Sequence, residues 1–430
     1  MPFYRKDPEE HTKKDIVFPM PPLFSISFVV PSDGAIFGGI MLIFDKQEYV
    51  KRLRNVKESM TRAGLEVLLV TDPANMNYIT GYDGWSFYVH QGVIVALDYE
   101  EPIWFGREQD KNGACLTTWL TADNIRGYKD HYVQSLIHHP MQYAADIIRE
   151  MGWEKKNLGI EKDNYYFTGK CLEVLYDELP LNELMDANCL VNLVRVIKSD
   201  QEIAYMKMAA RICENVMQTA INAIGTGVRE GDAAAKVMHA QIAGTPEFTG
   251  DYSAINPIMP SGVRTSTAHL SWTDRTYKTG EMVLLELSGC KNRYHAPLSR
   301  TVMIGKPDPA LEDIAKWVIN GLNQTVDFIK PGVTAEEVEE TWRKSISGSG
   351  VVKESRIGYS YGLNYPPDWG EHTVSLRPGD KTVLKPGMTI HVMPGIWLDK
   401  FGFECSEPIL VTECGCETFV KFDRKLYINE

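Results

Sequence analysis

Two stretches in the second half of the chain repeat one pattern, and this repeat constrains the fold most strongly. In each stretch a helix is expected to end at a Gly-Val turn, at residues 227–228 and 332–333, and a second helix follows. Strand-like segments come next, at 283–304 and 383–412. The pattern predicts two helix–helix–strand halves in a pseudo-symmetric repeat, and chance likeness of two helical hairpins is the alternative. Ligand sites often lie where such halves meet.

The first half of the chain shows a different alternation of helices and strands. Tyr49, Leu53, Val56 and Met60 recur at helical spacing, Gly64 can cap the helix, and a buried strand is expected directly afterwards. Similar helix and strand patterns continue to about residue 195. We therefore predict an α/β protein with three parts. These are an irregular extension over 1–40, a mixed α/β domain over 41–195 and the repeated domain over 196–430.

Length, charge and cysteine content narrow the class of protein. A chain of 430 residues favours two domains, and a net charge of −12 argues against nucleic acid and anionic membrane as partners. Neither a secretory signal nor an apolar run long enough to span a membrane is present, so a cytoplasmic location is expected. The eight cysteines lack regular spacing, and Cys414 and Cys416 have no second pair at zinc-finger distance. Reduced thiols are therefore expected, with no structural metal.

Residues 283–301, with the sequence VLLELSGCKNRYHAPLSRT, read as a strand, a turn and a second strand. The only carboxylate in this hairpin, Glu286, stands in an otherwise apolar run, where burying an unpaired charge is costly. A buried ion pair with an arginine such as Arg300 is one explanation. A cationic substrate is the other explanation. We favour it because the attraction within a buried ion pair seldom offsets the free-energy cost of desolvating both charges.

Several ordered motifs carry a family resemblance. They are NLVRVIKSDQEIAYMKMAA, SGVRTSTAHLSW, RYHAPLSRT, GYSYG, HVMPGIW and PILVTE. In this order they resemble the pita-bread superfamily of methionine aminopeptidase, prolidase and creatinase, from about residue 45 to the end. The resemblance implies a creatinase-like N-terminal domain followed by a pita-bread catalytic domain.

The metallopeptidases of that family hold two metal ions with two Asp, one His and two Glu. By resemblance, these five ligand positions correspond to Glu286, Pro297, Tyr359, Met393 and a position at or beside Ser406. Proline and methionine cannot bind a hard divalent ion, and one glutamate cannot hold a pair of ions. The resemblance therefore implies a metal-free member without a cofactor.

Among metal-free members, the ectoine hydrolases are the group that the chain resembles most, through TGYDGWSFYVHQG and LLELSGCKNRYHAPLSRT. This resemblance implies hydrolytic opening of the cyclic amidine ring of ectoine, or of its hydroxylated form. His269, at the position of the acid/base histidine of creatinases, is expected to transfer protons. Glu286 is expected to act as nucleophile, or else as general base for water. A packed structural histidine is the alternative for His269.

The resemblance also implies a homodimer in which an N-terminal loop reaches the active site of the other subunit. Trp85, Tyr88 and His90 would then line the pocket, although a buried aromatic cluster is equally compatible with these residues. Tyr359, His391 and Glu404, at or near former ligand positions, are the further candidates for substrate binding. Two other functions remain open, namely a creatinase-like amidinohydrolase and a non-catalytic pita-bread binding protein.

Overall fold

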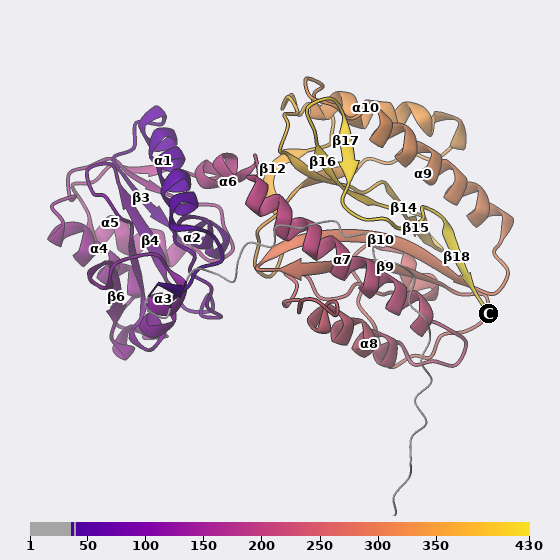
Figure 1. Ribbon diagram of the computed structural model, residues 1–430, viewed down its shortest axis with the longest axis horizontal. Helices are drawn as coiled ribbons and strands as arrows, with labels where there is room; N and C mark the ends of the chain where they lie inside the picture. The colour runs from indigo at the N-terminus through magenta and orange to yellow at the C-terminus, as the bar shows by residue number, and fades with distance from the viewer. Residues whose placement is uncertain (1–35, 38–39) are drawn as a thin grey trace, which may run out of the picture. The chain divides into compact units, whose positions relative to one another are not determined.

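The computed structural model describes residues 36–37 and 40–430, so the predicted extension over 1–40 lies almost entirely outside the described residues. The first half of the chain forms a six-stranded sheet in the order β6-β5-β4-β3-β7-β8 (Figure 1). Its strands are β3 (Val67–Val70), β4 (Gly92–Ala96), β5 (Ile103–Arg107), β6 (Ile125–Tyr128), β7 (Leu158–Ile160) and β8 (Leu184–Asp186). Before them, β1 (Ile36–Phe37) pairs with β2 (Ile40–Met41). β4 runs antiparallel to both its neighbours, and the remaining pairs are parallel.

Six helices accompany this sheet in the described part of the chain. They are α1 (Lys46–Arg62), α2 (Pro73–Thr80), α3 (Lys111–Thr117), α4 (Pro140–Glu150), α5 (Gly169–Glu178) and α6 (Leu190–Arg195). The predicted helix of the first unit is confirmed, because Tyr49, Leu53, Val56 and Met60 are buried on one face of α1. Gly64 adopts φ of 72° just beyond its end, a conformation that glycine reaches without strain.

The repeated half is confirmed as two helix–helix–strand units. The first contains α7 (Asp200–Ala223), α8 (Glu230–Ala243), β9 (Met282–Lys291) and β10 (Tyr294–Ile304). The second begins with α9 (Pro309–Phe328) and α10 (Ala335–Ser345). Its strands are β11 (Gly358–Tyr361), β12 (Gly370–Ser375), β13 (Thr389–Val392), β14 (Gly395–Trp397), β15 (Gly402–Glu404), β16 (Glu407–Val411), β17 (Cys416–Thr418) and β18 (Leu426–Asn429). The strands form sheets in the orders β18-β10-β9, β12-β11-β13-β16-β17 and β14-β15.

Matching hydrogen bonds relate the two halves. Gly227 and Gly332, at φ of 83° and 92°, donate their N–H groups to Tyr277 and Leu384 respectively. At the ends of the strand pairs, the N–H of Ile304 donates to the carbonyl of Glu281, and the N–H of Val411 donates to the carbonyl of Met388. The helical hairpins are therefore equivalent structural units, and the chance likeness that the sequence left open is wrong.

The halves meet at two serines in corresponding positions. The N–H of Ser406 donates to the carbonyl of Ser299 at 3.2 Å, and the N–H of Ser299 donates to Oγ of Ser406 at 2.7 Å. Beside them, Arg300 forms a buried ion pair with Glu407 at 2.7 Å. This junction lies next to Glu286, since Ser299 is the β-sheet partner of Glu286.

Helix α7 packs closely against β9, as Figure 1 shows. At Gly289 of β9, an added Cβ atom would lie 2.0 Å from the carbonyl oxygen of Ala209 in α7. Glycine at this point permits the backbone of the strand to touch the backbone of the helix. This contact fixes the position of β9 and hence of Glu286.

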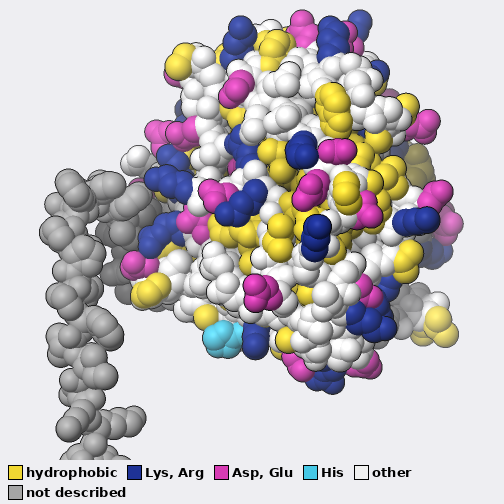
Figure 2. All heavy atoms as spheres, turned by 90° about the vertical axis from the view of Figure 1, so that its right-hand side faces the viewer, with side chains coloured by type: hydrophobic (Ala, Val, Ile, Leu, Met, Phe, Trp, Pro, Cys, Tyr) yellow, Lys and Arg dark blue, Asp and Glu magenta, His cyan; other side chains and the backbone are white. Residues whose placement is uncertain are grey.

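The charged side chains of one face of the molecule are mixed in sign. On the face shown in Figure 2, Lys and Arg side chains lie interspersed with Asp and Glu side chains and form no continuous basic patch. Among residues 36–37 and 40–430, no helix is long and apolar enough to cross a membrane. The domain limits at 41, 195 and 196 stay predictions.

Candidate active site

A cavity of about 810 Å³ opens between the two halves of the repeated region. Its lining comes from several loops, from β9, β11 and β14, and from one tyrosine of the first half of the chain. The lining residues are Tyr165, Ile255, Asn256, Ile258, Ser266, Thr267, Ala268, His269, Ser271, Glu286, Lys353, Ser355, Arg356, Tyr359, Pro367, Asp368, Met393 and Trp397. The size and the few converging polar groups are those of a small-molecule site.

Glu286 reaches this cavity from a rigid backbone position. Its strand neighbour is Ser299 on one side, and on the other side Glu286 and Ile258 exchange two backbone hydrogen bonds of 3.1 and 3.2 Å. The side chain is 6% exposed and has no hydrogen bond or ion pair with any described residue. Arg300, the ion-pair partner that the sequence left open, is paired with Glu407 instead. A partner for Glu286 must therefore come from the contents of the cavity.

The environment strongly favours the protonated form of Glu286. Burial raises its pKa well above the usual value, and the charges of Glu404 and Asp368 raise it further. Glu404, at the end of β15, is itself buried, and burial raises its pKa to about 7 against the opposing charge of Lys353. Oε1 of Glu404 has no hydrogen-bond partner among the described residues. Glu404 does not line the cavity and acts on Glu286 through its charge.

A chain of neutral hydrogen bonds connects two of the former ligand positions. The hydroxyl of Tyr359 accepts a hydrogen bond from Nε1 of Trp369 at 2.8 Å and lies 3.3 Å from Nδ1 of His391. Nε2 of His391 lies 2.7 Å from Oγ of Ser406. Burial lowers the pKa of His391 to about 3, so the ring is neutral and donates only one of its two bonds. His391 therefore supports Tyr359 from behind, while Tyr359 itself lines the cavity.

The donor set does not fit the pair of metal ions that the family resemblance implies for metallopeptidases. Pro297 has no donor, Met393 offers a thioether, and Tyr359 and Ser406 are already joined through His391. Among the described residues, no three His, Cys, Asp or Glu side chains converge at this cavity. Hard divalent ions need several oxygen ligands, and these residues do not supply them.

His269 lines the same cavity as Glu286. It lies in the loop that follows the 3₁₀ turn Gly262–Ser266, and its side chain is exposed. No hydrogen bond to another described residue fixes its ring. An imidazole between the cavity and solvent is suited to carry protons between them. Its catalytic role stays a prediction.

Two cationic side chains that line the cavity were not predicted from the sequence. Lys353 is held by the carbonyl of Gly395 at 2.7 Å and by Oγ of Ser355 at 2.8 Å, and burial lowers its pKa to about 8. The guanidinium of Arg356 lies 4.4 Å from the ring centroid of Tyr359. Arg356 has no ion pair or hydrogen bond with any described residue, so its donors are free for a ligand. Both residues lie in an irregular loop, where no periodic pattern marks them.

The three aromatic candidates of the first half do not line the cavity of their own chain. Trp85 and Tyr88 are 58% and 62% exposed, and Trp85 packs edge-on against Tyr252. His90 is half-buried, and burial lowers its pKa. Their predicted place was the cavity of a second subunit, so their role in binding stays a prediction.

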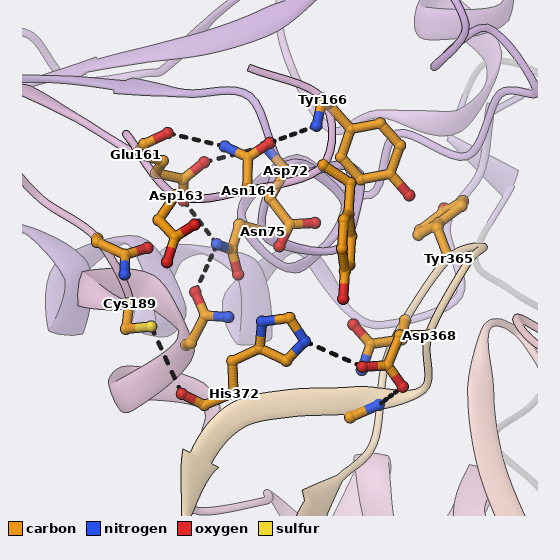
Figure 3. A pocket seen from close by; sticks show the side chains of 15 residues that line it. Asp72, Asn75, Glu161, Asp163, Asn164, Tyr166, Cys189, Tyr365, Asp368 and His372 are labelled. Carbon is orange, nitrogen blue, oxygen red and sulfur yellow. Dashed lines mark hydrogen bonds and ion pairs between the residues drawn. The ribbon is translucent and has the colours of Figure 1, made fainter. Parts of the chain in front are cut away.

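A smaller polar pocket adjoins the cavity, and Tyr165 and Asp368 line both. Figure 3 shows Asp368 facing His372, with Oδ2 and Nε2 separated by 3.0 Å. Glu161, at the far side, is held by two backbone N–H groups and by Asn75. The pocket measures about 30 Å³, which is room for one or two water molecules and too little for an organic substrate.

Comparison with known proteins agrees with this architecture. Residues 52–197 match the creatinase/prolidase N-terminal domain, and residues 204–413 match metallopeptidase family M24. The chain is 42% identical to an ectoine hydrolase of Halomonas elongata, over 91% of this chain and 99% of the relative. An uncharacterized hydrolase/peptidase of Sinorhizobium fredii is also 42% identical, over 91% of this chain and all of the relative. More distant is an Xaa-Pro dipeptidase of Pyrococcus furiosus, at 28% identity over 87% of this chain and 99% of the relative.

Solved structures show the same fold. The prolidase of Pyrococcus horikoshii superposes with a TM-score of 0.73 at 23% identity, covering 87% of this chain and 99% of the prolidase. Dipeptidase PepE of Mycobacterium ulcerans gives 0.74 at 20% identity, over 90% and 99%. The predicted fold, a creatinase-like N-terminal domain followed by a pita-bread domain, is therefore confirmed. The chain belongs to metallopeptidase family M24, within the group that carries a creatinase/prolidase N-terminal domain.

Proposed function

We propose that this protein hydrolyses the cyclic amidine ring of ectoine, or of hydroxyectoine, to an N-acetylated 2,4-diaminobutyrate without a metal ion. Ectoine combines a ring amidinium with a carboxylate. The observation that carries the proposal is Glu286, a buried carboxyl group without a partner in the cavity lining. The sequence similarity to an ectoine hydrolase, which extends over nearly the whole chain, supports the same substrate.

The charges around the cavity match a zwitterion. An amidinium beside Glu286 would favour the ionised carboxylate and so offset the burial that now raises its pKa. The substrate carboxylate would then meet Arg356, whose guanidinium has no ion pair or hydrogen bond within the described part of the chain, with Lys353 as a second cation. Arginine binds carboxylates with two parallel hydrogen bonds, which fixes the orientation of the ring.

In the proposed reaction the ionised Glu286 attacks the ring carbon between the two nitrogens and forms a C–O bond. The C–N bond to the leaving ring nitrogen then breaks, and His269 supplies the proton that this nitrogen takes up. Water next attacks the same carbon and gives one proton to His269. The C–O bond to Glu286 then breaks, and the released amine takes up the second proton of the water. Alternatively, Glu286 removes a proton from water, which attacks the ring carbon directly, and the C–N bond breaks as the leaving nitrogen takes up a proton from His269.

We further propose a cytoplasmic homodimer in which the loop 81–91 of one subunit completes the cavity of the other. Trp85 and Tyr88 support this arrangement because two large aromatic side chains of the same loop are exposed. An aromatic wall suits a flat cation. The eight cysteines are free thiols, which supports a reducing compartment.

One set of incubations tests the substrate and the metal together. Purified protein is given ectoine, creatine or an Xaa-Pro dipeptide, each with and without a chelator, and the products are followed by mass spectrometry. We expect ectoine opening that survives the chelator. Dipeptide cleavage that the chelator abolishes would overturn the proposal, creatine turnover would assign an amidinohydrolase, and no turnover would leave a binding protein.

A further inference from the structure

Three side chains from separate segments of the first half form a cluster of nitrogen and sulfur donors. His90 lies just before β4, His139 is the N-cap of α4, and Cys171 lies in the first turn of α5. One donor atom of each lies within 4.8 Å of the other two. The cluster lies outside the lining of the proposed active-site cavity. From this geometry we propose that His90, His139 and Cys171 bind one zinc-class transition-metal ion.

The distances suit a tetrahedral ion. Sγ of Cys171 lies 3.6 Å from Nδ1 and 3.8 Å from Nε2 of His90. With metal–nitrogen bonds of about 2.0 Å and metal–sulfur bonds of about 2.3 Å, tetrahedral ligands stand about 3.5 Å apart. The rings of His90 and His139 lie with their centroids 4.8 Å apart at an interplanar angle of 33°. A small closing movement of the two rings therefore brings the donors to bonding distance.

The donor types select the class of ion. Two imidazoles and a thiolate favour zinc and related transition metals, whereas magnesium and calcium require oxygen ligands. Binding releases the thiol proton of Cys171 to solvent as the metal–sulfur bond forms. Both histidines are half-buried and Cys171 is buried, so the ion approaches from the histidine side. A water molecule fills the fourth position.

The ion would join three segments of the first half through direct metal–ligand bonds. These are the loop 81–91, the start of α4 and the start of α5; the two helices pack together, as Figure 1 shows. The loop carries Trp85 and Tyr88, so the ion would also hold the aromatic side chains proposed to reach a second subunit. Only this last consequence rests on the proposed function.

The test measures metal binding in the full-length protein in the absence of ectoine. Equilibrium dialysis against Zn²⁺ is followed by elemental analysis, and Co²⁺ serves as a spectroscopic probe of thiolate ligation. We expect one Zn²⁺ per chain and a thiolate-to-cobalt charge-transfer band. His139→Asn and Cys171→Ser are each expected to weaken Zn²⁺ binding at least about tenfold and to remove or diminish this band.

The variants are chosen to keep the fold. Nδ1 of His139 accepts the N–H of Met141, and asparagine provides the same helix cap without an imidazole. His239→Asn and Cys414→Ser, both at exposed positions, are the matched controls and should bind as the wild type does. Undiminished Zn²⁺ binding by His139→Asn and Cys171→Ser would overturn the proposal. So would loss of Zn²⁺ binding in Glu286→Gln, which would place the ion in the active-site cavity.

Discussion

At the scale of single residues, the cavity contains proton-carrying groups where the metallopeptidases of the family hold metal ligands. Glu286 keeps a carboxyl group at one former ligand position, while Tyr359 and Ser406 are linked through the neutral ring of His391. The donor set does not fit a pair of hard divalent ions. The proposed reaction therefore relies on Glu286 and on His269, which line the same cavity.

Replacement of Glu286 by glutamine tests the central residue. We expect Glu286→Gln to lower kcat for ectoine by at least about 10³-fold, because the amide is neither nucleophile nor base. The free energy of unfolding at pH 8 should rise by about 1–3 kcal/mol, because the raised pKa of the buried Glu286 disfavours folding at a pH where the unfolded chain has released this proton. Turnover and urea denaturation measure the two effects. Glu354→Gln, at an exposed position, is the control and should change neither. Near-normal turnover in Glu286→Gln would rule out both proposed roles.

The pKa of Glu404 gives a prediction for stability against pH. Burial raises it to about 7, whereas the unfolded chain has the ordinary value near 4.5. Between these values the folded state retains a proton that the unfolded state has lost, so stability falls as pH rises. We expect the wild type to lose on the order of 1–3 kcal/mol between pH 5 and 8 relative to Glu404→Gln. Urea denaturation at both pH values measures this difference, and parallel curves would contradict it.

Arg356 offers a test of substrate orientation. Arg356→Ala should raise KM for ectoine about 10–100-fold through loss of a charge-assisted hydrogen-bonded pair, with a smaller change in kcat. Arg356→Lys should recover part of the affinity, because the charge returns without the planar fork. Arg211→Ala is the control, since Arg211 is an exposed partner of Glu247. An unchanged KM in Arg356→Ala would place the substrate carboxylate elsewhere.

At the scale of elements, the sequence predicted what depends on local chemistry. The capping box of Ser199 and Glu202 begins α7, and that of Thr334 and Glu337 begins α10, so the two helical hairpins were visible in the sequence. Thr168 caps α5, again through a local hydrogen bond to the backbone of the first turn. By contrast, Lys353 and Arg356 lie in a loop whose path depends on the strands around it. No spacing rule marks such residues.

The contact between α7 and β9 gives a prediction about element packing. Gly289→Ala would place a Cβ atom 2.0 Å from the carbonyl of Ala209, and backbone on both sides cannot yield cheaply. We expect a loss of at least about 3 kcal/mol in the free energy of unfolding, together with reduced activity as Glu286 moves. Gly113→Ala is the matched control, because nothing lies within 4 Å of its added Cβ in α3. That change should be neutral or stabilise by about 1 kcal/mol. Thermal or urea unfolding of both variants measures these changes in the free energy of unfolding.

At the scale of the whole molecule, the sequence revealed only some of the contacts between segments that are far apart in the chain. The family motifs indicated that Glu286, His269 and Tyr359 share one site, and the cavity lining contains all three. The cluster of His90, His139 and Cys171 escaped notice, because its members are far apart in sequence and metal-site spacing rules detect only nearby ligands. Packing of the sheet with α4 and α5 creates that proximity.

The proposed sharing of sites between subunits can be tested by mixing two inactive variants. Glu286→Gln lacks the catalytic carboxyl group but keeps Trp85 and Tyr88, while the double variant Trp85→Ala, Tyr88→Ala keeps Glu286. Each homodimer should be nearly inactive. If the loop of one subunit completes the cavity of the other, a mixed dimer contains one intact site. Random exchange of subunits should then restore about a quarter of wild-type activity, since about half of the dimers are mixed.

The controls distinguish a site shared between two subunits from a role of the loop 81–91 within its own subunit. Analytical ultracentrifugation first establishes that both variants form dimers, and a denaturation–refolding step lets the subunits exchange. Mixing Glu286→Gln with His269→Ala is the control, because His269 and Glu286 line one cavity of the same chain and neither mixed site is then complete. Activity restored by the first mixture alone supports the shared site. Without restoration, Trp85 and Tyr88 act within their own subunit, whose cavity they do not line, and the proposed arrangement fails.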